Sequence, residues 1–301
     1  MARLAPTMPD APTKSSIVPV GEAEVDVVAA SDAISDVELL SRYEALLTDD
    51  DRHRYSQQRF EEGRRRFLIT RALARYVLSI NCGVASDDLV FGADQWGKPM
   101  LLHPCENRVA FNIAHTSGLI VVAVARADAI GVDIEYPSPI DENFEIAQRF
   151  FSAKEVEALR ALPPKVRDER FFDYWTLKEA YVKGRGVGLS LPFNCFAIDF
   201  RDGSRPRLAV EPNVDDGRKW QLDLMSLSSG HRLAVAVELP PSGRPFEVRL
   251  SRAVPFNVLA SEQSGETGPS RPMAAGIEDQ PAPSKARFPQ CRDDVSSDCE
   301  V

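Results

Sequence analysis

Two segments of this chain resemble each other, and their spacing is the strongest constraint on the fold. The segments "TSGLIVVAVA" (116–125) and "SSGHRLAVAV" (228–237) each place a serine–glycine turn before an apolar strand, 112 residues apart. This likeness fits either an internal duplication or a chance match, because turn-and-strand segments resemble one another easily. A duplication would give two similar α+β halves with a cleft between them, and such clefts often bind ligands.

Composition limits the region that can fold. Residues 1–20 are rich in Pro, Ala, Ser and Thr and predict a flexible tail, whereas residues 241–301 lack periodicity and predict a disordered tail. We place an N-terminal subdomain at 21–128 and a C-terminal subdomain at 129–240.

Charge and hydropathy exclude several classes of protein. The 301-residue chain has a net charge of −9, which argues against a globally basic nucleic-acid binder. It has no apolar stretch long enough to span a membrane, and its first residues lack the apolar core of a signal peptide. We expect a cytoplasmic protein with neither nucleic-acid nor membrane partners.

Hydrophobic periodicity predicts a mixed α+β fold. Ser152 and Glu155 have the spacing of a helix N-cap and its capping-box partner. Helices are predicted at 63–80, 142–151, 152–162 and 168–184, and strands at 108–116, 119–127, 130–136, 194–200 and 231–239.

Carboxylates occur at two unusual places. On a strand, Asp133 and Glu135 of "GVDIE" point to one face, where they repel each other unless they lie at a solvated strand end. In the helix at 168–184, Lys178 falls on the apolar stripe and Glu179 lies beside it. If Glu179 faces the strand pair, three carboxylates without a Cys or His cluster indicate Mg²⁺ or Mn²⁺ rather than zinc. The alternative for Glu179 and Lys183 is an ordinary i,i+4 ion pair.

Candidate phosphate ligands lie upstream. The run "DRHRYSQQRFEEGRRRF" (51–67) is either a charged helix face or an arginine fork for a phosphate. "WGKP" (96–99) predicts a turn, and His115 follows a strand, although a lone histidine is more often structural. The most economical interpretation is a Mg-dependent enzyme whose substrate carries a pyrophosphate and a further phosphate. A Mg-dependent phosphodiesterase or nuclease, and a non-catalytic scaffold, are the alternatives.

Six motifs resemble one known family. "GVDIE", "FFSAKEV" and "WTLKEAYVKGRGVGLSLP" occur in the order typical of the Sfp-like 4′-phosphopantetheinyl transferases, and "RRRFLITRALAR", "GKP" and "FNIAHTSG" extend the similarity upstream. The resemblance implies a pseudo-dimer of two similar α/β subdomains with the active site in the cleft between them. It also implies that the phosphopantetheine arm of coenzyme A is moved onto a serine of an apo carrier protein, with release of adenosine 3′,5′-bisphosphate.

The resemblance also assigns roles to individual residues. It implies that Asp133, Glu135 and Glu179 hold Mg²⁺, for which Mn²⁺ would substitute, with Asp133 also contacting coenzyme A. Glu179 would take the serine proton, with Glu155 as a second candidate. The implied coenzyme A ligands are Lys178 and Lys183 at the pyrophosphate, Arg66, His115 and Thr116 with the weaker candidate Arg54 at the 3′-phosphate, and Gly97, Lys98 and Pro99 beside the adenine. The expected partners of a monomeric enzyme are apo acyl or peptidyl carriers of fatty-acid, polyketide or nonribosomal-peptide synthesis.

Overall fold

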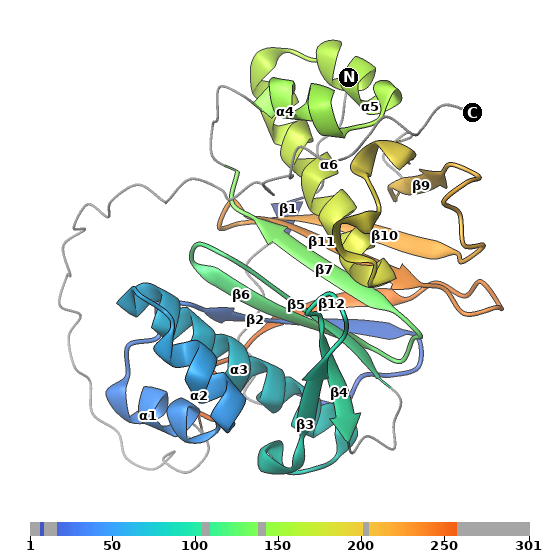
Figure 1. Ribbon diagram of the computed structural model, residues 1–301. Coiled ribbons are helices and arrows are strands. Elements are labelled where there is room, and N and C mark those ends of the chain that lie inside the picture. Colours follow the sequence, from blue (N-terminus) through green and yellow to red (C-terminus); the bar gives the residue numbers. More distant parts are fainter. Residues whose placement is uncertain (1–6, 9–16, 104–108, 138–142, 201–204, 258–301) are drawn as a thin grey trace, which may run out of the picture. The chain divides into compact units, whose positions relative to one another are not determined.

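The computed structural model describes residues 7–8, 17–103, 109–137, 143–200 and 205–257 (Figure 1). Most of both predicted tails lies outside the described residues. None of the described helices is long and apolar enough to cross a membrane.

The first half of the fold is a strand, a set of helices, a hairpin and two further strands. The short strand β1 (Thr7–Met8) precedes it. Its elements are β2 (Glu24–Ser31), α1 (Val37–Ala45), α2 (Asp49–Ser56), α3 (Glu61–Cys82), η1 (Ser86–Asp88), β3 (Val90–Ala93), β4 (Pro99–His103), β5 (Ala110–Thr116) and β6 (Leu119–Ala125).

The second half repeats this order of elements, and β12 (Glu247–Arg252) follows it. Its elements are β7 (Ile130–Glu135), α4 (Asn143–Phe150), α5 (Ala153–Arg160), α6 (Pro164–Arg185), η2 (Gly188–Ser190), η3 (Phe193–Cys195), β8 (Phe196–Asp199), β9 (Arg207–Val210), β10 (Trp220–Leu227) and β11 (Arg232–Glu238). The predicted boundary near residue 128 falls between β6 and β7, and the division into two subdomains stays a prediction.

Sheet topology shows that the two halves are equivalent. One four-stranded sheet has the order β12-β2-β6-β5 and the other has the order β1-β10-β11-β7. The antiparallel strands β2-β6-β5 therefore correspond to β7-β11-β10. Each half also has a helix of 22 residues, α3 or α6, and a two-stranded hairpin, β3–β4 or β8–β9. The predicted α+β pseudo-dimer is confirmed, and the resemblance between the two turn-and-strand segments reflects it.

The two sheets share one core, and each packs a helix on its other face. In β2, Val25 and Val27 lie in the core between the sheets, whereas Val28 packs with the residues of α3. In β7, Val132 and Ile134 lie in the core between the sheets, so Asp133 and Glu135 point to the opposite face, where α6 packs on β7. Figure 1 shows α6 across β7, β11 and β10 and α3 beside β2 and β6.

Both predicted tail boundaries need correction. The strand β12 pairs in parallel with β2, and Phe246 before it is buried, so ordered structure continues past residue 240. At the other end, Ile17 and Val20 are buried, and the backbone N–H of Val20 donates to Asn81 Oδ1 at 2.8 Å. Edge segments of this kind bury only part of their side chains, so their sequences carry a weak hydrophobic pattern.

Candidate active site

A pocket lies where the two halves meet. Its volume is about 300 Å³, and residues of both halves line it. The first half contributes the β3–β4 turn and β5, and the second half contributes the C-terminal part of α6 and the residues that follow it. The lining residues are Asp94, Trp96, Gly97, Lys98, Pro99, Asn112, Ile113, Glu179, Val182, Lys183, Gly186 and Gly188.

Two glycines allow α6 to pack closely on β7 beside this pocket. A Cβ atom on Gly131 would lie 1.9 Å from the carbonyl oxygen of Ala180 and 2.3 Å from the backbone nitrogen of Gly184. A Cβ atom on Gly184 would lie 2.7 Å from the ring of Trp220. Only glycine permits this approach of helix to strand, which faces Glu179 and Lys183 of α6 toward the carboxylates of β7.

The contact between α6 and β7, called the junction below, places three carboxyl groups near the ammonium of Lys183. They belong to Asp133, Glu135 and Glu179. Lys183 Nζ donates to Asp133 Oδ1 at 2.5 Å. Burial alone would lower the pKa of Lys183, but the carboxylates of Asp133 and Glu179 raise it above its ordinary value. The Lys183 side chain therefore stays protonated at neutral pH.

Two of these carboxyl groups, those of Glu135 and Glu179, have raised pKa values. Burial, with the charge of Asp133 beside it, raises the pKa of Glu179 to about 7, and the same two causes raise that of Glu135 to about 8. The Trp175 indole donates a hydrogen bond to Glu135, which stabilises the carboxylate. Trp175 therefore contacts the site directly.

The donor set fits a hard divalent cation. Asp133 Oδ2 is buried and has no hydrogen-bond partner among the described residues, and the charge of Asp133 acts on the carboxyl groups of both Glu135 and Glu179. All-oxygen ligands of this kind suit Mg²⁺ and Mn²⁺. Among the described residues, no three His, Cys, Asp or Glu side chains are already gathered as metal ligands, and Lys183 holds the other oxygen of Asp133.

Lys178 does not reach this junction, so its predicted contact with the pyrophosphate is wrong for this structure. Its ammonium is fully buried and donates to Glu155 Oε2 at 2.9 Å and to the carbonyl oxygens of Phe193 and Phe196, both at 2.7 Å. These three acceptors use all three of its N–H donors. Burial lowers the pKa of Lys178 to about 8, although Glu155 opposes the shift.

Glu155 has a structural explanation, as its sequence position suggested. It completes the capping box with Ser152, accepts from the backbone N–H of Ile198 at 2.8 Å, and is 1% exposed. Its carboxylate therefore faces Lys178 instead of the pocket. Glu179 lines the pocket and remains the candidate base.

The β3–β4 turn closes one side of the pocket. Gly97 has φ +84°, and Lys98 pairs with Asp94 through the backbone of the turn. Lys98 Nζ donates to the carbonyl oxygen of Lys183 at 2.6 Å, and burial lowers its pKa to about 8. The predicted turn is confirmed, and its lysine links the hairpin to the end of α6.

Arg66 and His115, both in the first half, lie close enough to interact electrostatically. Arg66 of α3 contacts Asp32 and Glu62. Partial desolvation, with the positive charges of Arg66 and Lys183 nearby, lowers the pKa of His115 at the end of β5. His115 therefore lies near both Arg66 and the carboxylate junction, and Thr116 follows it as the last residue of β5. Arg54 is exposed on α2 and pairs with Asp50, and no described contact connects it with Arg66 or His115.

Several residues of the site were missed from sequence. Asn112 Oδ1 accepts from the backbone N–H of Val132 at 2.9 Å and so joins β5 to β7 beside Asp133. Trp96 lines the pocket, and a Cβ atom on Gly188 would lie 3.2 Å from its ring. Asn112 lies between the apolar residues Phe111 and Ile113, which was a usable signal, whereas Asp32 has no local signal.

Comparison with known proteins identifies the family. A model described as "4'-phosphopantetheinyl transferase superfamily" matches residues 129–237, and one described as "4'-phosphopantetheinyl transferase, N-terminal" matches residues 36–127. Together they match more than half of the chain, which belongs to the 4′-phosphopantetheinyl transferase superfamily. The predicted family and transferase class are confirmed, and neither the nuclease nor the scaffold alternative is supported.

Individual relatives carry the same description. The chain is 37% identical over 147 residues to the 4′-phosphopantetheinyl transferase HetI of Nostoc sp.. The match covers 48% of this chain and 62% of HetI, so the chain spans less than two thirds of that relative. It is 28% identical over 199 residues to Sfp of Bacillus subtilis, covering 66% of this chain and 85% of Sfp. Among solved structures, the chain is similar to Helicobacter pylori holo-[acyl-carrier-protein] synthase in complex with coenzyme A. The two chains are 22% identical with a TM-score of 0.31, and the match covers 36% of this chain and 98% of the synthase.

Proposed function

We propose that this protein uses Mg²⁺ to transfer the phosphopantetheine arm of coenzyme A to a serine of an apo carrier protein, releasing adenosine 3′,5′-bisphosphate. The observation that carries the proposal is the pairing of one Asp133 oxygen with Lys183, while the other oxygen is buried near Glu135 and Glu179 and has no partner in the described part of the chain. Glu179 and Lys183 line the adjoining pocket, which has room for part of a coenzyme A molecule.

Asp133, Glu135 and Glu179 would hold the metal ion. When bound, Mg²⁺ would neutralise charge on the pyrophosphate as the leaving group departs. Metal binding requires ionised carboxylates, so it would displace the protons that the raised pKa values of Glu135 and Glu179 retain.

Lys183 supplies a fixed positive charge to the reaction. Because the carboxylates around it raise its pKa, it acts as an electrostatic partner of the pyrophosphate and not as a base. As the serine oxygen bonds to the β-phosphorus, the bond from that phosphorus to the bridging oxygen breaks and negative charge grows on adenosine 3′,5′-bisphosphate. The ammonium of Lys183 stabilises that charge.

Glu179 accepts the proton of the attacking serine hydroxyl. Glu179 lines the pocket, and once it is ionised its carboxylate can accept a proton there. Glu155 is buried against Lys178 and does not serve this step.

The remaining ligands would position coenzyme A. Arg66 and His115 would contact the 3′-phosphate, with Thr116 beside them, and the turn at Gly97, Lys98 and Pro99 would lie at the adenine. The proximity of Arg66 to His115 supports the first assignment, and the position of the turn on the pocket wall supports the second. We also propose that the enzyme is a cytoplasmic monomer, whose mass in sedimentation would be that of one chain.

The test is covalent labelling of a carrier. The protein is mixed with Mg²⁺, a fluorescent coenzyme A and apo carriers of the fatty-acid, polyketide and nonribosomal-peptide types. Transfer predicts a fluorescent carrier band that disappears with EDTA and returns with Mg²⁺ or Mn²⁺. Absence of labelling on every carrier would overturn the proposed function, and labelling that persists in EDTA would overturn its metal dependence.

A further inference from the structure

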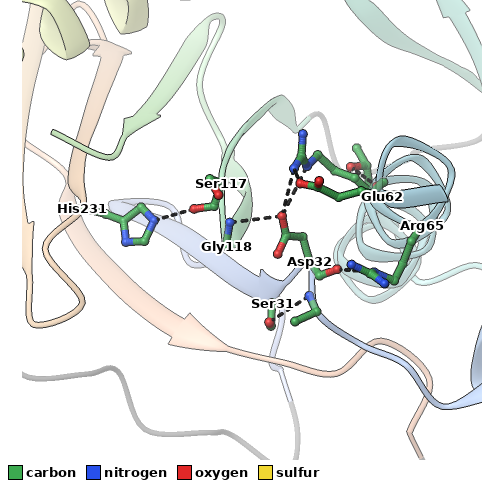
Figure 2. Close-up of polar contacts among 10 residues, drawn as sticks. Ser31, Asp32, Glu62, Arg65, Ser117, Gly118 and His231 are labelled. Carbon is green, nitrogen blue, oxygen red and sulfur yellow. Dashed lines mark hydrogen bonds and ion pairs between the residues drawn. The ribbon is translucent and has the colours of Figure 1, made fainter. Parts of the chain in front are cut away.

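Asp32 connects two elements that carry proposed ligands of the 3′-phosphate. It directly follows β2 and is 7% exposed. Its Oδ2 atom accepts from Arg66 Nη2 at 3.2 Å and from the backbone N–H of Gly118 at 3.1 Å. Figure 2 shows Asp32 between Arg65 and Glu62 of α3 on one side and Gly118 on the other. One oxygen atom thus holds both α3 and the turn between β5 and β6.

The second contact fixes the end of β5. Ser117 and Gly118 form the turn, in which Gly118 has φ +86°. The turn is also held from the other half of the fold, because His231 Nε2 donates to the carbonyl oxygen of Ser117 at 2.9 Å (Figure 2). A carbonyl oxygen only accepts, so Nε2 carries the proton and Nδ1 accepts from Ser229. Asp32 and His231 together fix the turn that directly follows His115 and Thr116.

The first contact orients the guanidinium of Arg66. Asp32 accepts hydrogen bonds from Nε and Nη2 of Arg66, and Glu62 also accepts from Nη2. No described residue accepts from Nη1 of Arg66, which keeps two N–H donors for a ligand. Glu62 is 62% exposed and free to turn into solvent, whereas Asp32 is enclosed.

We infer that Asp32 is a positioning residue for recognition of the 3′-phosphate, an inference that rests on the proposed function. Its carboxylate sets the orientation of Arg66 and holds α3 at a fixed place relative to the strand that carries His115. The carbonyl oxygen of Asp32 adds a contact to Arg65 Nε at 2.9 Å, which further fixes this part of α3. A substitution at Asp32 should therefore reduce selectivity for the 3′-phosphate and leave the chemical step intact.

The test compares KM values for coenzyme A and 3′-dephospho-coenzyme A in carrier labelling. Asp32→Asn keeps the shape but loses the charge, so the KM for coenzyme A should rise roughly tenfold, with little change for the dephospho form and in kcat. Asp51→Asn is the matched control. Asp51 of α2 pairs at 2.9 Å with Arg71 of α3, the helix that also carries Arg66. It should change neither KM.

A double variant separates positioning from a general effect on the fold. In an Arg66→Ala background, Asp32→Asn should produce a much smaller further loss of selectivity than in the wild type, because only its contact with the turn after His115 remains. An additive loss would overturn the inference. If Asp32→Asn fails to fold, Asp32→Glu replaces it, because it keeps the charge but moves the carboxylate, and the same loss of selectivity is expected.

Failure of the inference differs from failure of the proposed function. If the wild type prefers coenzyme A and Asp32→Asn keeps that preference, only the role of Asp32 is wrong. If the wild type treats the two substrates alike, the 3′-phosphate assignment itself is wrong. If no carrier is labelled, calorimetric binding of adenosine 3′,5′-bisphosphate to the wild type and Asp32→Asn still tests Asp32, and equal affinities would reject it.

Discussion

Lys183 of α6 lies against Asp133 of β7, with Nζ 2.5 Å from Oδ1. The contact exists because Gly131 and Gly184 let the helix approach the strand closely. It neutralises one carboxylate of a crowded group and leaves Glu135 and Glu179 with raised pKa values. The predictions below follow from this arrangement.

Replacing Glu179 by Gln should abolish carrier labelling and preserve the fold. Glutamine has almost the same shape but neither binds a metal as a carboxylate does nor accepts the serine proton, so we expect a fall in kcat of at least about 100-fold. Labelling rates and circular dichroism of the purified variant check this. Turnover close to that of the wild type would remove Glu179 from the mechanism.

The stability of the metal-free protein should fall as pH rises from about 4.5 to 8. The folded-state pKa values of Glu179 and Glu135 lie above that of an unfolded glutamate, so the folded state binds these protons more tightly. Their favourable contribution is fully present below about pH 4.5 and is lost as pH rises through about 7 to 8. We expect a change on the order of 1–3 kcal/mol in the free energy of unfolding, measured by urea denaturation in EDTA.

The same measurement has two internal controls. Glu179→Gln should show a smaller fall in stability with pH, because one of the titrating groups is absent. Mg²⁺ should stabilise the wild type more at pH 8 than at pH 5, because it competes with protons for the carboxylates. Equal pH dependence in wild type and variant would contradict the account of the junction.

Breaking the buried pair of Lys178 and Glu155 should destabilise the fold. Lys178→Met leaves the Glu155 carboxylate buried without its cation, at an expected cost of about 3–5 kcal/mol in the free energy of unfolding. The double variant Lys178→Met/Glu155→Gln removes both charges and should recover much of that loss. A well-folded double variant that does not label a carrier would show that one of these residues takes part in catalysis.

A side chain at Gly131 should separate α6 from β7. Gly131→Ala places a Cβ atom within 2.3 Å of two backbone atoms of α6, so we expect a loss of about 3 kcal/mol or more in stability. Gly63→Ala is the control, because Gly63 lies in α3 and its nearest contact would be Gln58 Oε1 at 3.3 Å. It should be neutral or stabilise by up to about 1 kcal/mol, measured by thermal unfolding. Unchanged stability of Gly131→Ala would show that the close approach is not required.

The long periodic segments could be predicted from sequence. The helices expected at 63–80 and 168–184 correspond to α3 (Glu61–Cys82) and α6 (Pro164–Arg185), and each ends at a glycine with positive φ, Gly83 or Gly186. The strand β2 and the edge strand β12 were not predicted. A short apolar run such as that of β2 does not distinguish a strand from a buried helix segment, and β12 is mostly polar.

The candidate site could be predicted only in part, because periodicity identifies a face without showing what lies across it. Glu179 and Lys178 are consecutive on α6 and so point about 100° apart. Glu179 faces the pocket, whereas Lys178 faces Glu155. Asp32 was missed for a related reason, since its partners Arg66 and Gly118 are 34 and 86 residues away.

The most direct test of the central claim is a crystal soaked with Mn²⁺ and coenzyme A, examined by anomalous scattering. We predict one manganese peak about 2.0–2.3 Å from carboxylate oxygens of Asp133, Glu135 and Glu179, adjoining the pyrophosphate. A peak elsewhere, or coenzyme A bound with no metal between these side chains, would contradict the account.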